Sequence, residues 1–169
     1  MRLAAAITVL TLAADQASKA VVIHALNLPQ RLAIDVFPPW FNLRMAWNQG
    51  VNFGLFAGDS DAVRWTLIAI ALAICALVWR WCAREVAQAR ATGGNRWPMQ
   101  VSTGLLVGGA LGNVIDRIVY GAVADFINMS CCGINNPFAF NVADAAIFAG
   151  AFGLILFSGP ERGTTHKTP

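Results

Sequence analysis

Four apolar segments dominate the pattern of hydrophobic and polar positions along the chain. They cover about residues 3–26, 63–81, 99–120 and 138–157. Each is close to the roughly 20 residues that an α-helix needs to cross the hydrocarbon core of a bilayer. The pattern therefore predicts four transmembrane helices, with both chain termini on the same side of the membrane.

The segment between the first two apolar blocks, about residues 27–61, has a different pattern. Prolines and glycines interrupt it too often for a helix, and the short runs between them, such as 41–47, contain aromatic residues that suit strands. We expect a small sheet at the membrane surface, followed by a short interfacial helix near residues 59–64. Residues 83–98 are expected to form a solvated connector, and the tail, about 159–169, to be disordered.

Composition supports a membrane protein. Hydrophobic residues make up 57% of the chain and charged residues only 12%, about half of the charged share in an average soluble domain. The mean hydropathy is +0.56. The predicted fold class is thus an all-α integral membrane protein with four transmembrane helices and a small extracytoplasmic β-sheet region between helices one and two. We expect a single membrane domain over residues 1–169.

Most of the 12 basic residues flank one face of this arrangement. These are Arg2, Arg80, Arg84, Arg90, Arg96, Arg162 and Lys167. The stretch 118–137 has no Lys or Arg. Because basic residues favour the cytoplasmic side, we expect cytoplasmic termini and an extracytoplasmic 118–137 segment. The net charge of +3 is then a topology signal, and we expect no nucleic-acid partner.

Two aspartates, Asp125 and Asp144, are the candidate catalytic residues. Asp125 follows the third apolar segment, and Asp144 lies one turn into the fourth. A carboxylate at membrane depth costs about 3 kcal/mol or more unless it is paired or functional. Two carboxylates held close together share a proton and can activate water, which is the chemistry of an aspartyl hydrolase.

Further polar residues accompany the two aspartates. Asn113, Asp116 and Arg117 share a face at the end of the third predicted helix, and Asn141 precedes Asp144 by three positions. The pattern predicts one polar pocket at the outer membrane edge. The alternative is a purely structural network of hydrogen bonds between helices, which we consider less favoured because ionisable residues in membranes usually mark function.

Two other groups are candidates for support or substrate contact. Asp15 and Lys19 have the spacing of a helical ion pair, and their role, structural support or substrate contact, stays open at this stage. Asn48 and Gly50 lie in a predicted turn, from which Asn48 could bind an extended peptide. The cysteines and histidines lack the spacing of metal ligands, so we expect no metal and no cofactor.

The order of these motifs resembles the bacterial lipoprotein signal peptidases, also called signal peptidase II. The motifs are Asp15-Gln-x-x-Ser-Lys19, Asn48-x-Gly50, Gly108-Gly-Ala-Leu-Gly-Asn-x-x-Asp-Arg117, Val123-Ala-Asp-Phe126 and Phe140-Asn-x-Ala-Asp144. Each motif alone is weak, and the five together, in this order, are specific.

The resemblance implies a membrane aspartyl endopeptidase that removes signal peptides from diacylglyceryl-modified prolipoproteins, cutting before the lipidated cysteine. It implies a multi-pass protein of the bacterial inner membrane, with its active site near the extracytoplasmic face, surrounded by membrane lipids and monomeric. The implied roles are catalytic for Asp125 and Asp144, substrate-binding for Asn48, Asn113, Arg117 and Asn141, and supporting for Asp15, Lys19, Asp116 and Gly50.

Two other functions remain as alternatives. A Mg²⁺-dependent phosphotransferase acting on lipid head groups would use Asp116, Asp125 and Asp144 as ligands. A small transporter or scaffold with a polar relay would need polar residues across the whole membrane, whereas here they gather in the outer half.

Overall fold

The computed structural model describes residues 1–50, 60–131, 133 and 136–158. Part of the predicted insert, residues 51–59, and the predicted disordered tail, 159–169, lie outside the described residues. The helical elements are α1 (Arg2–Ala20), the π-helical turn η1 (Val21–Ala25), α2 (Leu28–Arg31), α3 (Ser60–Ala91), α4 (Trp97–Tyr120) and α5 (Val142–Phe157). The strands are β1 (Ala33–Phe37), β2 (Phe41–Asn48) and β3 (Val123–Asn128).

The four long helices occur where the sequence predicts them, with one large difference at α3. This helix begins at Ser60 and continues to Ala91, so the predicted interfacial helix near 59–64 is its first turn. Most of the predicted connector 83–98 is also helical, because residues 83–91 are rich in Ala, Arg, Glu and Gln, which favour helix. The connector is reduced to the short turn before Trp97.

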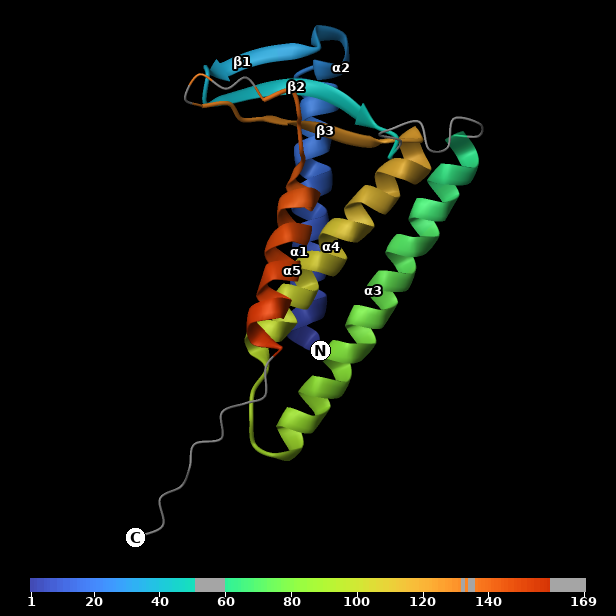
Figure 1. Ribbon diagram of the computed structural model, residues 1–169, viewed down its shortest axis with the longest axis vertical. Helices are drawn as coiled ribbons and strands as arrows, with labels where there is room; N and C mark the ends of the chain where they lie inside the picture. The colour runs from blue at the N-terminus through green and yellow to red at the C-terminus, as the bar shows by residue number, and fades with distance from the viewer. Residues whose placement is uncertain (51–59, 132, 134–135, 159–169) are drawn as a thin grey trace.

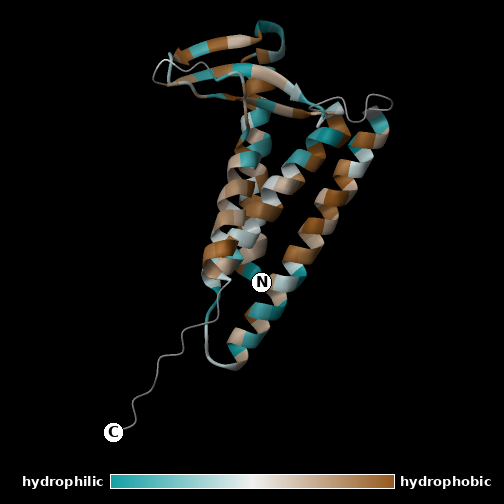
Figure 2. Cartoon of the chain, in the orientation of Figure 1, coloured by the Kyte–Doolittle hydropathy of each residue, from teal (hydrophilic) through white to brown (hydrophobic). Residues whose placement is uncertain are grey.

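Hydrophobic residues predominate along most of α3 and α5, as the brown ribbon in Figure 2 shows. On α5, Phe148 and Ile155 are 76% and 75% exposed. By length and composition two helical segments are suited to cross a membrane, Arg2–Ala25 and Asp61–Ala91, whereas α5 is apolar but has 16 residues. α4 is not one of these two segments, and its last turns carry Asn113, Asp116 and Arg117.

α4 is the central helix of the bundle and packs against α1, α3 and α5. Gly104, Gly108 and Gly112 of α4 are spaced by four residues, which allows close helix approach, and they face α1. A Cβ at Gly104 would lie 2.6 Å from that of Ile7, and a Cβ at Gly108 would lie 2.7 Å from that of Thr11. The glycines therefore bring α4 against the helix that carries Asp15 and Lys19.

The approach of α4 to α5 uses other glycines. Gly109 of α4 faces Ala143, and Gly150 of α5 lies against the backbone of Ser102 and Leu106. Gly150 thus allows the backbones of α4 and α5 to come close together. Because α4 contacts α1 on one side and α5 on the other, polar residues from three helices converge around its final turns.

The three strands form one antiparallel sheet in the order β1-β2-β3. Figure 1 shows the sheet lying across one end of the helices. Val22 of η1 and Leu28 of α2 pack with Leu43 and Phe126 beneath it. The sheet predicted between the first two helices is thus present, but the sequence prediction missed its third strand.

β3 comes from the segment after α4. Gly121, with φ 78°, ends α4 in the left-handed conformation, which glycine adopts without steric cost. The chain then pairs with β2, so that Asp125 lies opposite Ala46. The sequence predicts only that residues 123–128 lie outside the membrane, as part of the segment 118–137. Their strand structure depends on β2, which is remote in sequence.

Candidate active site

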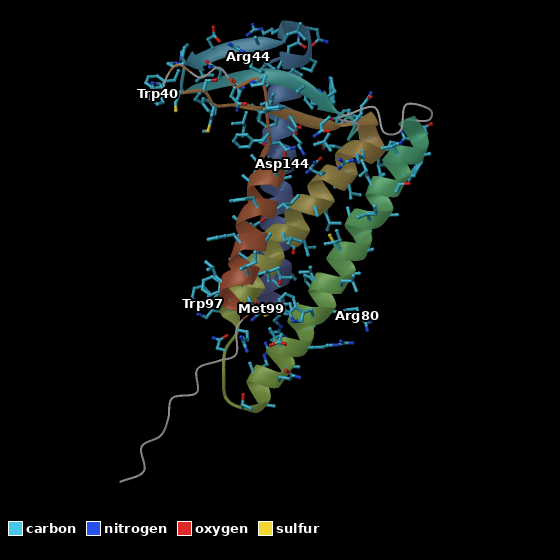
Figure 3. All side chains as sticks on the ribbon, viewed as in Figure 1. Trp40, Arg44, Arg80, Trp97, Met99 and Asp144 are labelled. Carbon is cyan, nitrogen blue, oxygen red and sulfur yellow. The ribbon has the colours of Figure 1, made fainter. Side chains whose placement is uncertain are left out.

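Asp144 lies in the first turn of α5, just below the sheet in Figure 3. Asn141 is the N-cap residue of α5: its side chain accepts a hydrogen bond from the Asp144 amide at 2.8 Å. The Asp144 carboxylate in turn accepts one from the Asn141 amide at 3.3 Å. This capping box satisfies donors that a helix start otherwise leaves unpaired, and it fixes the position of Asp144.

Asp125 projects from the middle of β3 and is 4% exposed. Its carboxylate accepts hydrogen bonds from Asn141 Nδ2 at 2.7 Å and from Asn48 Nδ2 at 3.1 Å. The donor Asn48 is held in turn by Gly50, whose backbone N–H donates to Asn48 Oδ1 at 2.9 Å. Gly50 therefore supports the site by orienting the Asn48 amide, at a backbone angle (φ +79°) that favours glycine.

Asn113 joins the two aspartates from α4. Its Nδ2 donates to Asp144 Oδ1 at 2.8 Å, and its Oδ1 accepts from Asn141 Nδ2 at 3.2 Å. Because Asn141 also donates to Asp125, a continuous chain of hydrogen bonds runs from Asp125 through Asn141 and Asn113 to Asp144. The predicted residues Asp125, Asp144, Asn48, Asn113 and Asn141 thus form one connected group.

Asp125 lies in an environment that disfavours its charged form. Burial, followed by repulsion from the Asp144 charge, raises the pKa of Asp125 from 3.8 to about 6. The hydrogen bonds from Asn48 and Asn141 and the charge of Lys19 oppose this increase. A carboxyl group that keeps its proton to a higher pH than usual, beside a second carboxylate, is the arrangement that acid–base catalysis by an aspartate pair requires.

A cavity of about 270 Å³ opens beside Asp125. One wall is the end of β2 with residues 49–50, and another consists of Pro137, Phe138 and Ala139. The aromatic residues Trp47 and Phe138 are exposed, so the cavity offers apolar surface next to a carboxyl group. Such a site can hold an apolar or peptide-like ligand against the reactive group.

Arg117 lies next to this group without a carboxylate partner among the described residues. Its Nη1 donates to the Asn113 carbonyl at 3.3 Å, and its buried Nε has no hydrogen-bond partner in the part of the chain that the structure describes. The Arg117 charge acts on Asp125, Asp144 and Asp116. Its free donors are suited to bind carbonyl groups of a ligand.

Asp15, Lys19 and Asp116 form a buried ionic cluster between α1 and α4. Lys19 Nζ lies 2.8 Å from Asp15 Oδ2 and 2.7 Å from Asp116 Oδ2. Lys19 is 2% exposed and both aspartates are fully buried. The predicted pair of Asp15 and Lys19 is thus confirmed as an ion pair, and Asp116 is the second carboxylate that binds Lys19.

Some participants were missed by sequence reasoning. Gln16 Nε2 bridges Asp15 and Asp116, at 3.1 and 3.2 Å. A glutamine beside an aspartate in an apolar segment was the available signal. The backbone N–H groups of Ala124 and Ala143, which also enter the cluster, carry no sequence signal at all.

The predicted magnesium site of the alternative phosphotransferase requires Asp116, Asp125 and Asp144 to converge. No three His, Cys, Asp or Glu side chains converge to hold a metal ion within the described ranges, and Asp116 is bound to Lys19. The donor set that this alternative needs is therefore not assembled.

Comparison with known proteins gives a consistent result. The family model described as signal peptidase (SPase) II matches residues 7–159. A lipoprotein signal peptidase of Methylobacterium sp. (strain 4-46) is 40% identical over 146 residues, which cover 86% of this chain and 82% of the relative. That of Methylobacterium radiotolerans is 43% identical over 166 residues, which cover 95% and 88%.

The fold is also found among solved structures. A bacterial membrane enzyme structure matches with a TM-score of 0.75 and 25% identity, over 92% of each chain. A second bacterial membrane enzyme structure, 22% identical, has a TM-score of 0.70 and supports the fold alone. Given the family match over most of its length and relatives above 40% identity, the chain belongs to the signal peptidase II family.

Proposed function

We propose that this protein removes signal peptides from diacylglyceryl-modified prolipoproteins, cutting before the lipidated cysteine, with Asp125 and Asp144 as its catalytic pair. The observation that carries the assignment is the single hydrogen-bonded network that includes both carboxyl groups and ends at a cavity. The family supplies the reaction class, and the network supplies residues able to perform it.

In the proposed mechanism the pair holds one proton, because two adjacent carboxylates do not ionise together cheaply. The raised pKa of Asp125 favours this residue as the proton carrier. Asp144, ionised, takes a proton from water as the water oxygen attacks the scissile carbonyl carbon, and Asp125 donates its proton to the carbonyl oxygen. When the C–N bond breaks, the leaving amine takes the proton held by Asp144, and one hydroxyl of the tetrahedral intermediate returns its proton to Asp125, which restores the pair.

The surrounding residues hold the peptide. Asn48 and Arg117 have donors beside the cavity, and Asn113 and Asn141 fix the carboxyl groups. Positioning of this kind provides much of the rate advantage of an enzyme over a bimolecular reaction in water. Aromatic side chains at the cavity mouth, Trp47 and Phe138, would contact apolar parts of the substrate.

The membrane placement is part of the proposal. Four membrane-spanning helices, α1, α3, α4 and α5, put both termini in the bacterial cytoplasm and the sheet with the active site at the outer face of the inner membrane. The basic residues support this orientation, since Arg80, Arg84, Arg90 and Arg96 lie at the helix ends opposite the sheet. The protein acts as a single-domain monomer whose acyl-chain-bearing substrate reaches the site from the bilayer.

The test is a gel-shift cleavage assay on a diacylglyceryl-modified prolipoprotein, with the purified full-length protein in detergent and a chelator present. Asp125→Asn and Asp144→Asn should each lower the rate about 1,000-fold or more, since each removes a group that transfers a proton. The wild-type rate should be indifferent to the chelator. Asp35→Asn is the matched control, because this carboxylate lies on β1, is largely exposed and pairs with Arg44.

The control should cleave at the wild-type rate. Substantial turnover by either dyad variant contradicts the assignment of the pair. A folded wild-type protein that fails to cleave contradicts the proposed reaction, and a rate that the chelator abolishes returns attention to metal-dependent chemistry.

A further inference from the structure

The buried cluster between α1 and α4 is connected to both proposed catalytic residues in the same way. Asp15 Oδ1 accepts the backbone N–H of Ala143 at 3.0 Å, and Ala143 directly precedes Asp144. Asp116 Oδ2 accepts the backbone N–H of Ala124 at 3.1 Å, and Ala124 directly precedes Asp125. Asp15 and Asp116 thus each bind the backbone N–H of the residue that directly precedes one member of the pair.

Lys19 is the common centre of these connections. Its ammonium group binds Asp15 and Asp116 at 2.8 and 2.7 Å, and it donates to Asn113 Oδ1 at 3.4 Å. An ammonium group has three donors, and here it has three acceptors. Asn113 Oδ1 accepts from both Lys19 and Asn141, and its Nδ2 is directed to Asp144, so Lys19 contributes to the orientation of that amide.

We propose that Lys19 is a positioning residue for both catalytic aspartates: through Asp15, Asp116 and Asn113 it sets the separation of the two carboxyl groups, and its positive charge offsets the negative charge of the pair. The inference rests on the proposed function, since it concerns the same pair. α1, β3 and α5 are separate segments of the chain that meet at the site. Lys19 of α1 connects them because it binds Asp116 and Asn113 of α4, which in turn contact β3 and α5.

The location of Lys19 separates this role from substrate binding. Lys19 is 2% exposed and does not line the cavity beside Asp125. A change at Lys19 should therefore act on kcat and not on KM. Displacement of reacting groups by about 1 Å costs roughly 100-fold in rate, and we expect a fall of this size in kcat for Lys19→Met.

The charge of Lys19 gives a second, independent readout. Among the described residues, the charged groups that face the pair are Asp15 and Lys19 from α1 and Asp116 and Arg117 from α4. The charge of Lys19 lowers the pKa of Asp125, so its removal, which leaves two carboxylates and one guanidinium, raises that pKa. Lys19→Met should thus displace the pH profile of kcat/KM to higher pH by about one unit.

Asp15→Asn provides the opposite change. It removes a negative charge from the same cluster and keeps the size of the side chain, so the profile should move to lower pH. A variant that only loosens the structure lowers the rate without displacing the profile in a direction set by charge. The two variants therefore test the electrostatic role by sign, and either of them suffices if the other does not fold.

The experiment uses the full-length protein in detergent and a diacylglyceryl-modified prolipoprotein. It compares wild type, Lys19→Met, Lys19→Arg and Asp15→Asn. Lys19→Arg retains the charge and should keep the wild-type pH profile even where its kcat is lower. Arg96→Met is the control for lost ion pairing, because Arg96 pairs with Glu85 near the opposite ends of the helices, and it should leave the profile unchanged.

The inference is supported by a lower kcat at constant KM and by displacements of opposite sign in Lys19→Met and Asp15→Asn. The inference is overturned if Lys19→Met and Asp15→Asn both keep the wild-type pH profile. It is also overturned if the pH profile of Lys19→Arg is displaced as far as that of Lys19→Met. Those results leave the proposed function intact provided that wild type cleaves and Asp144→Asn does not. A wild type that does not cleave overturns the proposed function and this inference together.

Discussion

Asn141 shows how single residues serve folding and the proposed chemistry together. As the N-cap of α5 it accepts a hydrogen bond from the Asp144 amide, and with its Nδ2 it donates to Asp125. The cap fixes which end of the amide faces Asp125, because the oxygen is already used. The same side chain thus starts the helix and presents a donor to the carboxylate on the strand.

The pH dependence of the reaction should reflect the environment of Asp125. If the pair works with one proton, activity declines when that remaining proton leaves. The alkaline limb of the kcat/KM profile reports this step in the free enzyme. We expect this limb near pH 6, where the pKa of Asp125 lies. The measurement is the initial cleavage rate at low substrate between pH 4 and 9.

A substitution at Asn48 should move this limb in a defined direction. The Asn48 amide donates to the ionised form of Asp125 and lowers its pKa, so Asn48→Ala should displace the alkaline limb to higher pH. Gln49→Ala is the control, since Gln49 lines the same cavity and has no hydrogen bond to either aspartate among the described contacts. Equal displacement in both variants contradicts the assigned role of Asn48.

At the residue scale the sequence predicted most of the site. Asp125, Asp144, Asn113 and Asn141 were identified because polar residues are rare in an apolar chain. The sequence alone indicates no contact by which Gly50 could support the site. In the structure its backbone N–H donates to Asn48 Oδ1 and orients the Asn48 side chain. Spacing alone did not indicate the partner of Asp116, which is Lys19 of α1, because an unpaired buried lysine is costly.

Among the elements, α4 carries the packing that assembles the site. The spacing of its glycines allows close contact with other helices, but spacing alone does not say which neighbour lies on which side. The three glycines spaced by four residues, Gly104, Gly108 and Gly112, pack on α1, and Gly109 packs on α5. In the same way, β3 is a strand because β2 lies beside it, and a six-residue segment taken alone has no such partner.

The α4–α5 contact can be tested at neighbouring positions. A Cβ at Gly150 would lie 2.5 Å from the Leu106 nitrogen and 2.6 Å from the Ser102 oxygen, both backbone atoms that side-chain rotation cannot move. Gly150→Ala should therefore separate the helices and lower the free energy of unfolding by about 1–3 kcal/mol. The measurement is the thermal unfolding midpoint in detergent.

Ala149→Val provides the comparison on the exposed side of the same turn. It adds more volume than Gly150→Ala does, but into the surrounding detergent, so its midpoint should stay close to that of wild type. A midpoint for Gly150→Ala equal to that of wild type contradicts the close contact.

For the whole molecule, the proposed orientation makes a prediction about accessibility. In a background without Cys131 and Cys132, a cysteine at Phe37, which is exposed on β1, should react with a membrane-impermeant maleimide in intact spheroplasts. A cysteine at Thr92, in the turn after α3, should react only after permeabilisation. The reverse pattern contradicts the orientation, and labelling of both in intact cells contradicts the separation of sheet and turn by the bilayer.

The sequence by itself determined the membrane class, the approximate positions of the long helices and the residue types of the site. These follow from local quantities: hydropathy over about 20 residues and the cost of polar groups in an apolar environment. Tertiary structure alone decided which helix packs on which, that Asp125 lies on a strand, and that Lys19 connects both catalytic candidates through Asp15 and Asp116. Most of those features depend on contacts between segments that are remote in the sequence, and backbone N–H groups, which are the same in every residue but proline, leave no trace in the sequence.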